Sequence, residues 1–293
     1  MSSKDVSAES LIYPAVMIIV VGMHYLLLNS TQSIQWATYL PVAIGAVSIA
    51  FLEWQYPFRY EWYPDCTDIG HDLTFMLLVQ VLLPRLLSFF VAVMLLAALN
   101  QNELTVNLGW PHEWSVVAQV VLMLLVADFF RYWLHRAAHE WAQPLWRLHA
   151  VHHSPKKLYW LNVGRFHPLE KSIQFLFDAF PFILLGVSAE VLALYFIFYS
   201  VNGFFQHCNV KLQLGPLNYI ISGPELHRWH HSRIIAESNT NYGNNLIIWD
   251  TLFGTRYLPE SHEVQELGLL NRNYPISFIA QMKTPFVSDL DQG

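Results

Sequence analysis

The sequence is poor in charge: only 13% of its 293 residues are Asp, Glu, Lys or Arg, whereas 54% are hydrophobic and the mean hydropathy is +0.30. An ordinary soluble domain is about one quarter charged, so this composition excludes one and indicates a membrane protein. The formal net charge is -6 and there is no block of basic residues, which argues against nucleic acid as a partner. Lipids are the expected partners instead.

Cysteine is also scarce, since Cys66 and Cys208 are the only two in the chain. They form no spacing pattern, which excludes a disulfide framework and a thiolate metal site. Two motifs are missing as well: an HPGG-type haem-binding sequence, so no fused haem domain is expected, and the HExxH sequence of zinc-dependent hydrolases. Histidine, by contrast, occurs 14 times, and nine of the 14 fall into dense groups between His135 and His231.

Four apolar runs are each long enough to cross a bilayer as a helix, at residues 11–28, 36–52, 73–99 and 114–134. A cleaved signal peptide is the alternative for the first run, but the run is long and no small-residue cleavage site follows it. Pro84 and Arg85 interrupt the third run, so a kink or a shallow break is expected there.

Lysine and arginine are missing from the short connections 29–35 and 100–113, whereas residues 131–171 contain seven of them. The positive-inside rule therefore puts the latter segment in the cytoplasm, and an even number of spans puts the amino terminus, with Lys4, on the same side. The apolar region 173–205 must return the chain to that side. Pro181, Gly186 and Ser188 near its middle predict two short helices that enter the membrane as a hairpin. The sequence thus predicts an all-α integral membrane protein with about four transmembrane helices, this hairpin and a cytoplasmic histidine-rich helical cap.

The histidines follow helical spacing. In "DFFRYWLHRAAHE", Asp128, Tyr132, His135 and His139 fall on one helix face, although an HxxxH pair alone is also explained by hydrogen bonding between helices. "LHAVHHS" and "LHRWHHS" each place three histidines at i, i+3 and i+4, on a single side of a helix. With the histidine of "FFQHCNV", which lies where the hairpin re-emerges, nine candidate metal ligands result: His135, His139, His149, His152, His153, His207, His227, His230 and His231.

Nine imidazoles are more than twice the four that close one tetrahedral zinc site, so two metal ions are expected. Imidazole suits zinc, copper, iron and nickel, whereas calcium and magnesium require oxygen ligands. His167 in "GRFHPLE" is either a tenth ligand or part of a structural turn before Pro168, and His207 could instead be a core histidine. The remaining histidines have no partner at helical spacing and are not expected to bind metal: His24, His71, His112 and His262.

These motifs resemble those of the fatty acid hydroxylase and sterol desaturase superfamily, integral membrane non-haem di-iron oxygenases. The resemblance covers residues 128–259, where "YWLHRAAHE", "LHAVHHSP", "RFHPLE", "FQHCN", "LHRWHHS" and "NYGNNLIIWDTLFGT" follow the family's order and spacing. It implies that the nine histidines bind iron and that His167 is a further ligand. Lys211 replaces a second histidine that fatty acid 2-hydroxylases carry, so the chain is more similar to the sterol-oxidase and alkylglycerol-monooxygenase branches.

The resemblance also implies three regions: membrane spans at 1–113, a fatty acid hydroxylase-like catalytic domain at 114–260 and a carboxyl-terminal tail at 261–293. The expected reaction is hydroxylation, or alternatively desaturation, of a lipid C–H bond by O2 at two iron ions, for which zinc could substitute in a structure. The substrate would be a sterol, a fatty acyl chain or an ether lipid. Because no haem domain is fused, electrons are expected from a separate protein that resembles ferredoxin or cytochrome b5, with its reductase. No catalytic residue is expected beyond the metal ligands.

Outer carboxylates and amides are expected to fix the histidine tautomers, and the candidates are Asp128, Glu225, Asn241 and Asp250. Asp128 lies about 10.5 Å along the helix axis from His135, too far for direct contact. We expect it to accept a hydrogen bond from His207 or a histidine of an HxxHH motif, with an ion pair to Arg131 as an equal alternative. Two other functions stay open: a metal transporter or sensor, which would place its ligands inside the spans, and a zinc-dependent hydrolase, although the first motif reads HRAAH.

Overall fold

The computed structural model describes residues 8–102, 109–288 and 290. Lys4 and residues 103–108 of the expected outer connection lie outside these ranges. Within them the chain folds into helices joined by loops, with three isolated β-bridges and no strand. The prediction of an all-α protein is therefore confirmed.

Four helical segments are long and apolar enough to cross a membrane, as predicted. Their outward faces carry large apolar side chains, for example Ile18 at 71% exposure and Met94 at 72%. Lipid tolerates such a surface and water does not, so these segments identify an integral membrane protein. The segments are α1 (Ala8–Thr31), α2 (Ile34–Gln55), the continuous run of α3 (Cys66–Phe75), η2 (Met76–Leu82) and α4 (Leu83–Asn102), and α5 (Val116–Glu140).

The predicted break at Pro84 takes the form of a π-helical turn. Proline lacks a backbone N–H, and its ring obstructs the carbonyl group four residues earlier. The turn η2 directly precedes it, and the Leu83 N–H bonds to the Leu78 carbonyl, five residues back. The third span therefore continues through the proline with one wide turn, as single π-turns allow.

The predicted hairpin is present, but its two arms differ in length. The first arm is divided into α7 (Pro168–Asp178) and α8 (Phe180–Leu184), and the second is the 19-residue helix α9 (Ala189–His207). The chain reverses between α8 and α9, where Gly186 adopts a φ of +68° that favours glycine.

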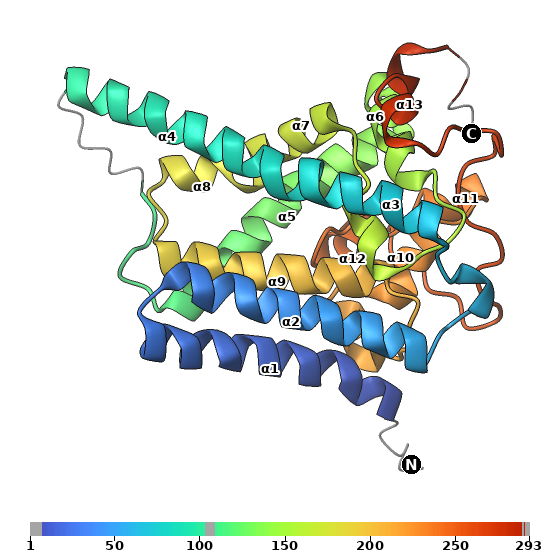
Figure 1. Ribbon diagram of the computed structural model, residues 1–293, viewed down its shortest axis with the longest axis horizontal. Coiled ribbons are helices and arrows are strands. Elements are labelled where there is room, and N and C mark those ends of the chain that lie inside the picture. Colours follow the sequence, from blue (N-terminus) through green and yellow to red (C-terminus); the bar gives the residue numbers. More distant parts are fainter. Residues whose placement is uncertain (1–7, 103–108, 289, 291–293) are drawn as a thin grey trace.

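Helix α9 lies at the centre of the bundle, beside α2 and α5, with α1 on the outer side of α2 (Figure 1). Its sequence is apolar nearly all round, and it buries Ile197, Val201 and Phe205 against Val20 of α1 and Ile49 of α2. A helix surrounded in this way is held by protein contacts rather than by lipid. Its carboxyl end, at His207, is therefore a fixed point for the site.

The remaining short helices gather at one end of the bundle, near the carboxyl ends of α5 and α9 (Figure 1). An ion pair of 3.6 Å between Glu9 and Lys211 places the first turn of α1 at this same end, as an even number of spans requires. The short helices at this end are α6 (Gln143–His153), α10 (Pro224–His230), α11 (Ile235–Ser238), α12 (Ile248–Phe253) and α13 (Phe278–Gln281). The 3-10 turns are η1 (Tyr60–Trp62), η3 (Trp160–Gly164), η4 (Gly215–Tyr219) and η5 (Thr284–Phe286).

Candidate metal centre

Four helices that are distant in the sequence bring nine histidines together at this end of the bundle. The last turns of α5 supply two, α6 supplies three, α9 ends on one, and α10 with the residue that follows it supplies three. They form two groups, and within each group one side-chain nitrogen per histidine lies within 4.8 Å of all the others. Group one is His135, His139, His149, His153 and His230, and group two is His152, His207, His227 and His231.

In group one the inner nitrogens converge on one point. The Nε2 atom of His153 lies 3.1 Å from the Nε2 atoms of His139, His149 and His230 alike, and Nε2 of His135 lies 2.9 Å from that of His149. A ring nitrogen carries at most one proton, so one atom cannot hydrogen-bond to three others of its kind. The arrangement fits nitrogen lone pairs that face a common cation.

Group two has the same character. The Nε2 atom of His227 lies 3.0 Å from Nε2 of His207 and 3.1 Å from Nε2 of His231. The fourth member, His152, is held by its ring, which stacks on Phe166 with centroids 4.2 Å apart. The two groups are neighbours, because the rings of His153 and His231 stack at 4.4 Å.

The outer nitrogens of six histidines are fixed by hydrogen bonds. Each Nδ1 atom lies near an oxygen, so Nδ1 donates and the proton is assigned to it. This leaves the Nε2 lone pair free to face inward, the tautomer that a metal-binding imidazole requires. The acceptors are the Tyr242 carbonyl for His135 (2.8 Å), Asn239 for His139 (3.2 Å), Glu170 for His149 (2.7 Å), the Arg165 carbonyl for His152 (3.2 Å), Asn162 for His207 (2.7 Å) and the Thr240 carbonyl for His230 (2.8 Å).

Burial keeps these imidazoles neutral. Desolvation, reinforced by the neighbouring histidines, holds the pKa values of His149, His152 and His153 well below the usual range. The pKa values of His227 and His231 are lowered for the same reasons, and burial lowers the pKa of His230 to about 4. Neutral imidazole is the form that binds a metal.

The four side chains expected to orient the histidines do not contact them. Glu225 accepts the Leu214 N–H and the Asn218 amide, and Asn241 bonds to backbone groups of Leu226 and Tyr257. Asp250 accepts the backbone N–H groups of Tyr242 and Gly243 and the Thr255 hydroxyl. Asn241 and Asp250 hold the loop that carries the Thr240 and Tyr242 carbonyls, whereas Glu225 holds the segment around Leu214 and Asn218. The prediction of direct contact with a histidine is wrong.

The expectation for Asp128 is also wrong, in both of its forms. Its carboxylate accepts the N–H groups of Asn245 (2.8 Å) and Leu246 (2.6 Å) and the Asn245 side-chain amide (2.8 Å). Arg131 pairs instead with Asp178, at 2.7 Å. The loop after Tyr242 crosses α5 at Asp128, and its three donor groups occupy the carboxylate in place of a histidine.

His167 lies outside both groups, which corrects the expectation of a tenth ligand. It is the N-cap of α7: its Nδ1 atom accepts the Leu169 N–H at 3.2 Å, and Pro168 occupies the first helical turn.

His24 bonds through Nδ1 to the Ala37 carbonyl at 3.0 Å, which joins α1 to α2. Like His24, the other three histidines not expected to bind metal lie outside the groups, namely His71, His112 and His262.

Three orienting side chains were missed: Glu170, Asn162 and Asn239. Glu170 lies in the "RFHPLE" motif, where a carboxylate beside a histidine could have been weighed as its partner. Asn162 lies in the turn η3 and Asn239 directly follows α11, and no sequence signal identifies either of them. Their role depends on which helix end each segment passes.

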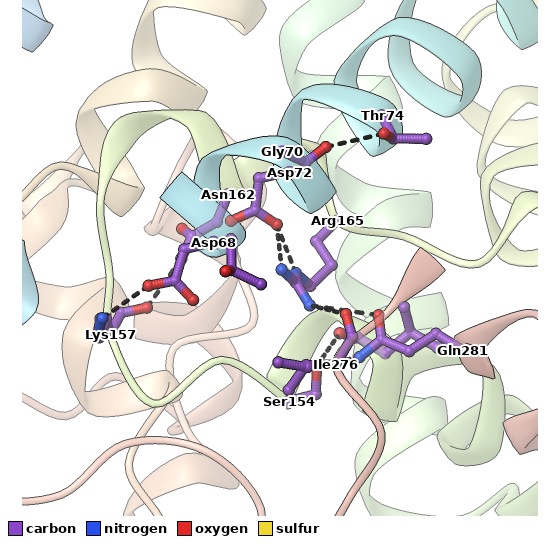
Figure 2. A network of polar contacts seen from close by, with 12 residues as sticks. Asp68, Gly70, Asp72, Thr74, Ser154, Lys157, Asn162, Arg165, Ile276 and Gln281 are labelled. Carbon is purple, nitrogen blue, oxygen red and sulfur yellow. Dashed lines mark hydrogen bonds and ion pairs between the residues drawn. The ribbon is translucent and has the colours of Figure 1, made fainter. Parts of the chain in front are cut away.

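A network of polar contacts braces the segment between His153 and His167 (Figure 2). The Arg165 guanidinium donates to Asp72 of α3, at 2.6 Å from Nε, and to the Ile276 carbonyl at 3.2 Å. Gln281 donates to the Ser154 hydroxyl at 2.8 Å. Because the Arg165 carbonyl is the acceptor for His152, this network ties group two to the third span and to the carboxyl-terminal segment.

A cavity of about 570 Å³ leads from the histidines into the bundle between α2, η2, α4, α5, α7 and α9. Five histidines line one end, and most of the rest is lined by apolar side chains such as Met76, Phe175 and Phe196. The histidines that line this end of the cavity are His135, His149, His152, His207 and His227. A molecule in this cavity would lie against both groups.

Comparison with known proteins agrees with this geometry. Residues 120–255 match the fatty acid hydroxylase family model. Ornithine lipid hydroxylase OlsE of Rhizobium tropici is 35% identical over 285 residues, which cover 96% of this chain and 84% of that protein. No solved structure matches the chain.

Two other relatives match over shorter stretches. The alkylglycerol monooxygenase of Xenopus tropicalis is 32% identical over 163 residues, 56% of this chain but only 35% of that protein. The very-long-chain aldehyde decarbonylase GL1-8 of Oryza sativa subsp. indica is 30% identical over 156 residues, 51% of this chain and 56% of the relative. The expected similarity to alkylglycerol monooxygenases is therefore found. Together, the family match, these relatives and the paired histidine groups show that the chain belongs to the fatty acid hydroxylase and sterol desaturase superfamily.

Proposed function

We propose that this chain is a membrane-bound non-haem di-iron oxygenase that hydroxylates a C–H bond of a lipid, with O2 as co-substrate. The observation that carries the proposal is the convergence of the Nε2 atoms of His139, His149 and His230 on that of His153, beside a second all-histidine group. Neither group contains a thiolate or carboxylate among the described residues. Such a donor set suits iron, and also zinc or copper.

Each group would hold one iron ion, group one through five histidines and group two through four. The pair of irons would supply the activation of O2 that attack on an unreactive C–H bond requires. The protein's own contribution is to fix each imidazole through its Nδ1 donor, to keep the rings neutral, and to hold the substrate in a cavity that excludes bulk water. Hydroxylation is favoured over desaturation because the relatives include a hydroxylase and a monooxygenase by name.

Substrate class, electron supply and orientation extend the proposal. The substrate would be a lipid of the bilayer, and the relatives' names point to a polar lipid or an ether lipid. Electrons would come from a separate protein that resembles ferredoxin or cytochrome b5. The seven basic residues between 131 and 171 favour a cytoplasmic position for the histidine groups. We also propose that residues 114–260 form the catalytic unit, carried by the spans at 1–113 and braced by the tail at 261–293.

The two alternative functions lack a supporting observation. A metal transporter would line a crossing path with polar ligands, whereas both histidine groups lie at one end of the bundle. A zinc hydrolase would need a carboxylate base beside its metal, and Glu170 instead accepts the Nδ1 proton of His149.

Iron content tests the proposal directly. The full chain, purified in detergent and reconstituted with Fe(II) without oxygen, should retain two irons per chain after gel filtration. Reduced chemically and then exposed to 18O2 with a lipid extract, it should place one 18O atom in a lipid product. At most one retained iron after full reconstitution would contradict the di-iron assignment, and no labelled lipid would contradict the oxygenase assignment.

A further inference from the structure

One side of the cavity beside the histidines is polar, although the cavity lies within an apolar bundle. We call this side the polar wall and define it as Arg131, Glu170, Gln174, Tyr199 and Asn244, all of which line the cavity. Arg131 is 6% exposed, Glu170 8% and Gln174 2%. Burial of such groups in a membrane protein is costly, so it calls for a ligand or a structural role.

Internal contacts hold most of the polar wall in place. Arg131 donates to Asp178 at 2.7 Å and to the Asn244 side-chain oxygen at 3.3 Å. The Gln174 amide donates to Oε1 of Glu170 at 2.9 Å, the same oxygen that accepts from His149. The wall is therefore rigid and joined directly to group one.

Two atoms of the polar wall are buried without a hydrogen-bond partner among the described residues: Oε2 of Glu170 and Nδ2 of Asn244. A buried polar atom without a partner is destabilising, and such atoms are uncommon in native proteins. The Asn244 nitrogen can only donate, whereas the free Glu170 oxygen accepts when the carboxyl is ionised and can donate when it is protonated. A hydrocarbon chain in the cavity would satisfy neither atom, whereas a polar group with both a donor and an acceptor would satisfy both.

Both atoms belong to residues next to the candidate metal ligands. Glu170 contacts His149 directly, and Asn244 follows Tyr242, whose carbonyl accepts the His135 Nδ1 proton, by two residues. Arg131 precedes His135 by one helical turn, about 6 Å along the axis of α5. A polar group bound here would lie beside group one.

The rest of the cavity suits an apolar chain. It extends along α9 from His207 to Phe196, and 11 residues of helix correspond to about 16 Å. Most of the side chains here are apolar, among them Val42, Val81, Phe175, Phe196 and Phe204, while Tyr39 and Arg85 also line this part, with Tyr39 in contact with Phe196. Because the histidines lie at the end of the bundle, a lipid with its polar end at Glu170 and Asn244 and its tail toward Phe196 keeps the orientation that it has in a bilayer.

We infer that the polar wall binds the head group of the lipid substrate, so that the hydroxylated carbon lies in the head group and not within the acyl chain. The ligand class is a head group that offers both a hydrogen-bond donor, such as an ammonium, amide or hydroxyl group, and an acceptor, such as a carbonyl or carboxylate. The inference rests on the proposed oxygenase function. The C–H bond breaks and a C–O bond forms, while the second oxygen atom of O2 leaves as water with two electrons from the external donor and two protons.

The position of the new oxygen tests the inference. A bacterial host that expresses the full chain is grown under 18O2, and its lipids are compared with those from cells that express the His152→Ala variant. Tandem mass spectrometry should locate one 18O atom in a head-group fragment of a lipid found only with the unmodified chain. Label in an acyl-chain fragment would overturn the inference and leave the oxygenase function intact. No labelled lipid at all would overturn both.

A matched pair of variants tests the wall itself with the purified parent lipid. Asn244→Leu removes the free donor and should raise KM about tenfold with a smaller change in kcat, because a hydrogen bond to a polar ligand is lost. Asn273→Leu makes the same exchange at an exposed position and should leave both constants within about twofold. Iron content at the unmodified level shows that the Asn244 variant has folded. An unchanged KM in that variant would contradict the assignment of Asn244, and product analysis of the unmodified chain decides the matter if the variant does not fold.

Discussion

The Nε2 atom of His153 lies 3.1 Å from the Nε2 atom of His230, although 77 residues separate the two histidines in the chain. The contact joins α6 to α10 and so connects the two HxxHH motifs within one group. Since the Nε2 atom of His153 cannot satisfy its three ring-nitrogen neighbours by hydrogen bonds, a bound cation is the simplest partner for both residues.

Loss of one histidine from either group should abolish activity without loss of membrane insertion. We expect His230→Ala, in group one, and His152→Ala, in group two, each to lower turnover below about a tenth, given that changes to outer partners alone cost 10-fold to 100-fold. The spans are held by lipid and packing, so the variants should still fractionate with membranes. His112→Ala, exposed and outside the groups, is the control and should keep nearly full turnover. Turnover above a tenth in either group variant would remove that histidine from the ligands.

The nine-histidine set was predictable because helical spacing alone puts the three histidines of each HxxHH motif on one face. The division into two groups was not, because it depends on the angles at which α5, α6, α9 and α10 meet. Asp128 illustrates the limit of such prediction. The sequence indicates that it lies close to the membrane interface, but its hydrogen-bond donors belong to a loop 117 residues further along the chain. His167 was ambiguous because a residue before proline can cap a helix or bind a ligand, and only the start of α7 decides between them.

The acceptors of the outer nitrogens should act on one group each. Asn239→Leu removes the acceptor of His139 in group one, and Asn162→Leu removes that of His207 in group two. Each variant should weaken one iron by 10-fold to 100-fold and leave the other bound. Titration of iron removal with a chelator, followed by Mössbauer spectroscopy, distinguishes the two sites. Equal weakening of both irons by either variant would contradict independent groups.

Asp128→Asn should reduce stability rather than iron affinity. An amide in place of the carboxylate presents an NH2 group to three donors, so we expect a loss of about 3 kcal/mol and a clearly lower thermal midpoint in detergent. Asp65→Asn is the control, because Asp65 is the exposed N-cap of α3 and asparagine caps a helix equally well. A weakened iron site with an unchanged thermal midpoint would contradict this prediction and would support a hydrogen bond between Asp128 and a histidine.

The metal-free protein should lose stability in acid. Burial lowers the pKa of His230 to about 4, so between that value and about 6.5 the unfolded chain binds a proton that the folded chain does not. Stability therefore falls as the pH drops below about 6.5, by about 2 kcal/mol at pH 5 from one such histidine. Thermal midpoints of the iron-free chain from pH 7.5 to pH 5 measure this, and a flat profile would contradict neutral imidazoles.

The orientation in the membrane can be read from the natural cysteines. Cys66 is exposed at the start of α3, and Cys208 is buried. The Lys157–Asp68 ion pair of 2.6 Å places the start of α3 at the histidine end. A membrane-impermeant maleimide should label Cys66 in inverted vesicles and not in intact cells, and Cys66→Ser should abolish the signal. Labelling in intact cells would place the histidine groups outside the cytoplasm.

His152 and His153 are successive residues, yet they belong to different groups. Both lie in the last turn of α6, which ends at His153 and is followed by the C-cap Ser154. One peptide bond therefore joins a histidine of one proposed metal position to a histidine of the other, so α6 links the two groups covalently. Movement of α6 during a reaction cycle would shift both metals together, so a change in their separation would have to come from the histidines of α5, α9 and α10.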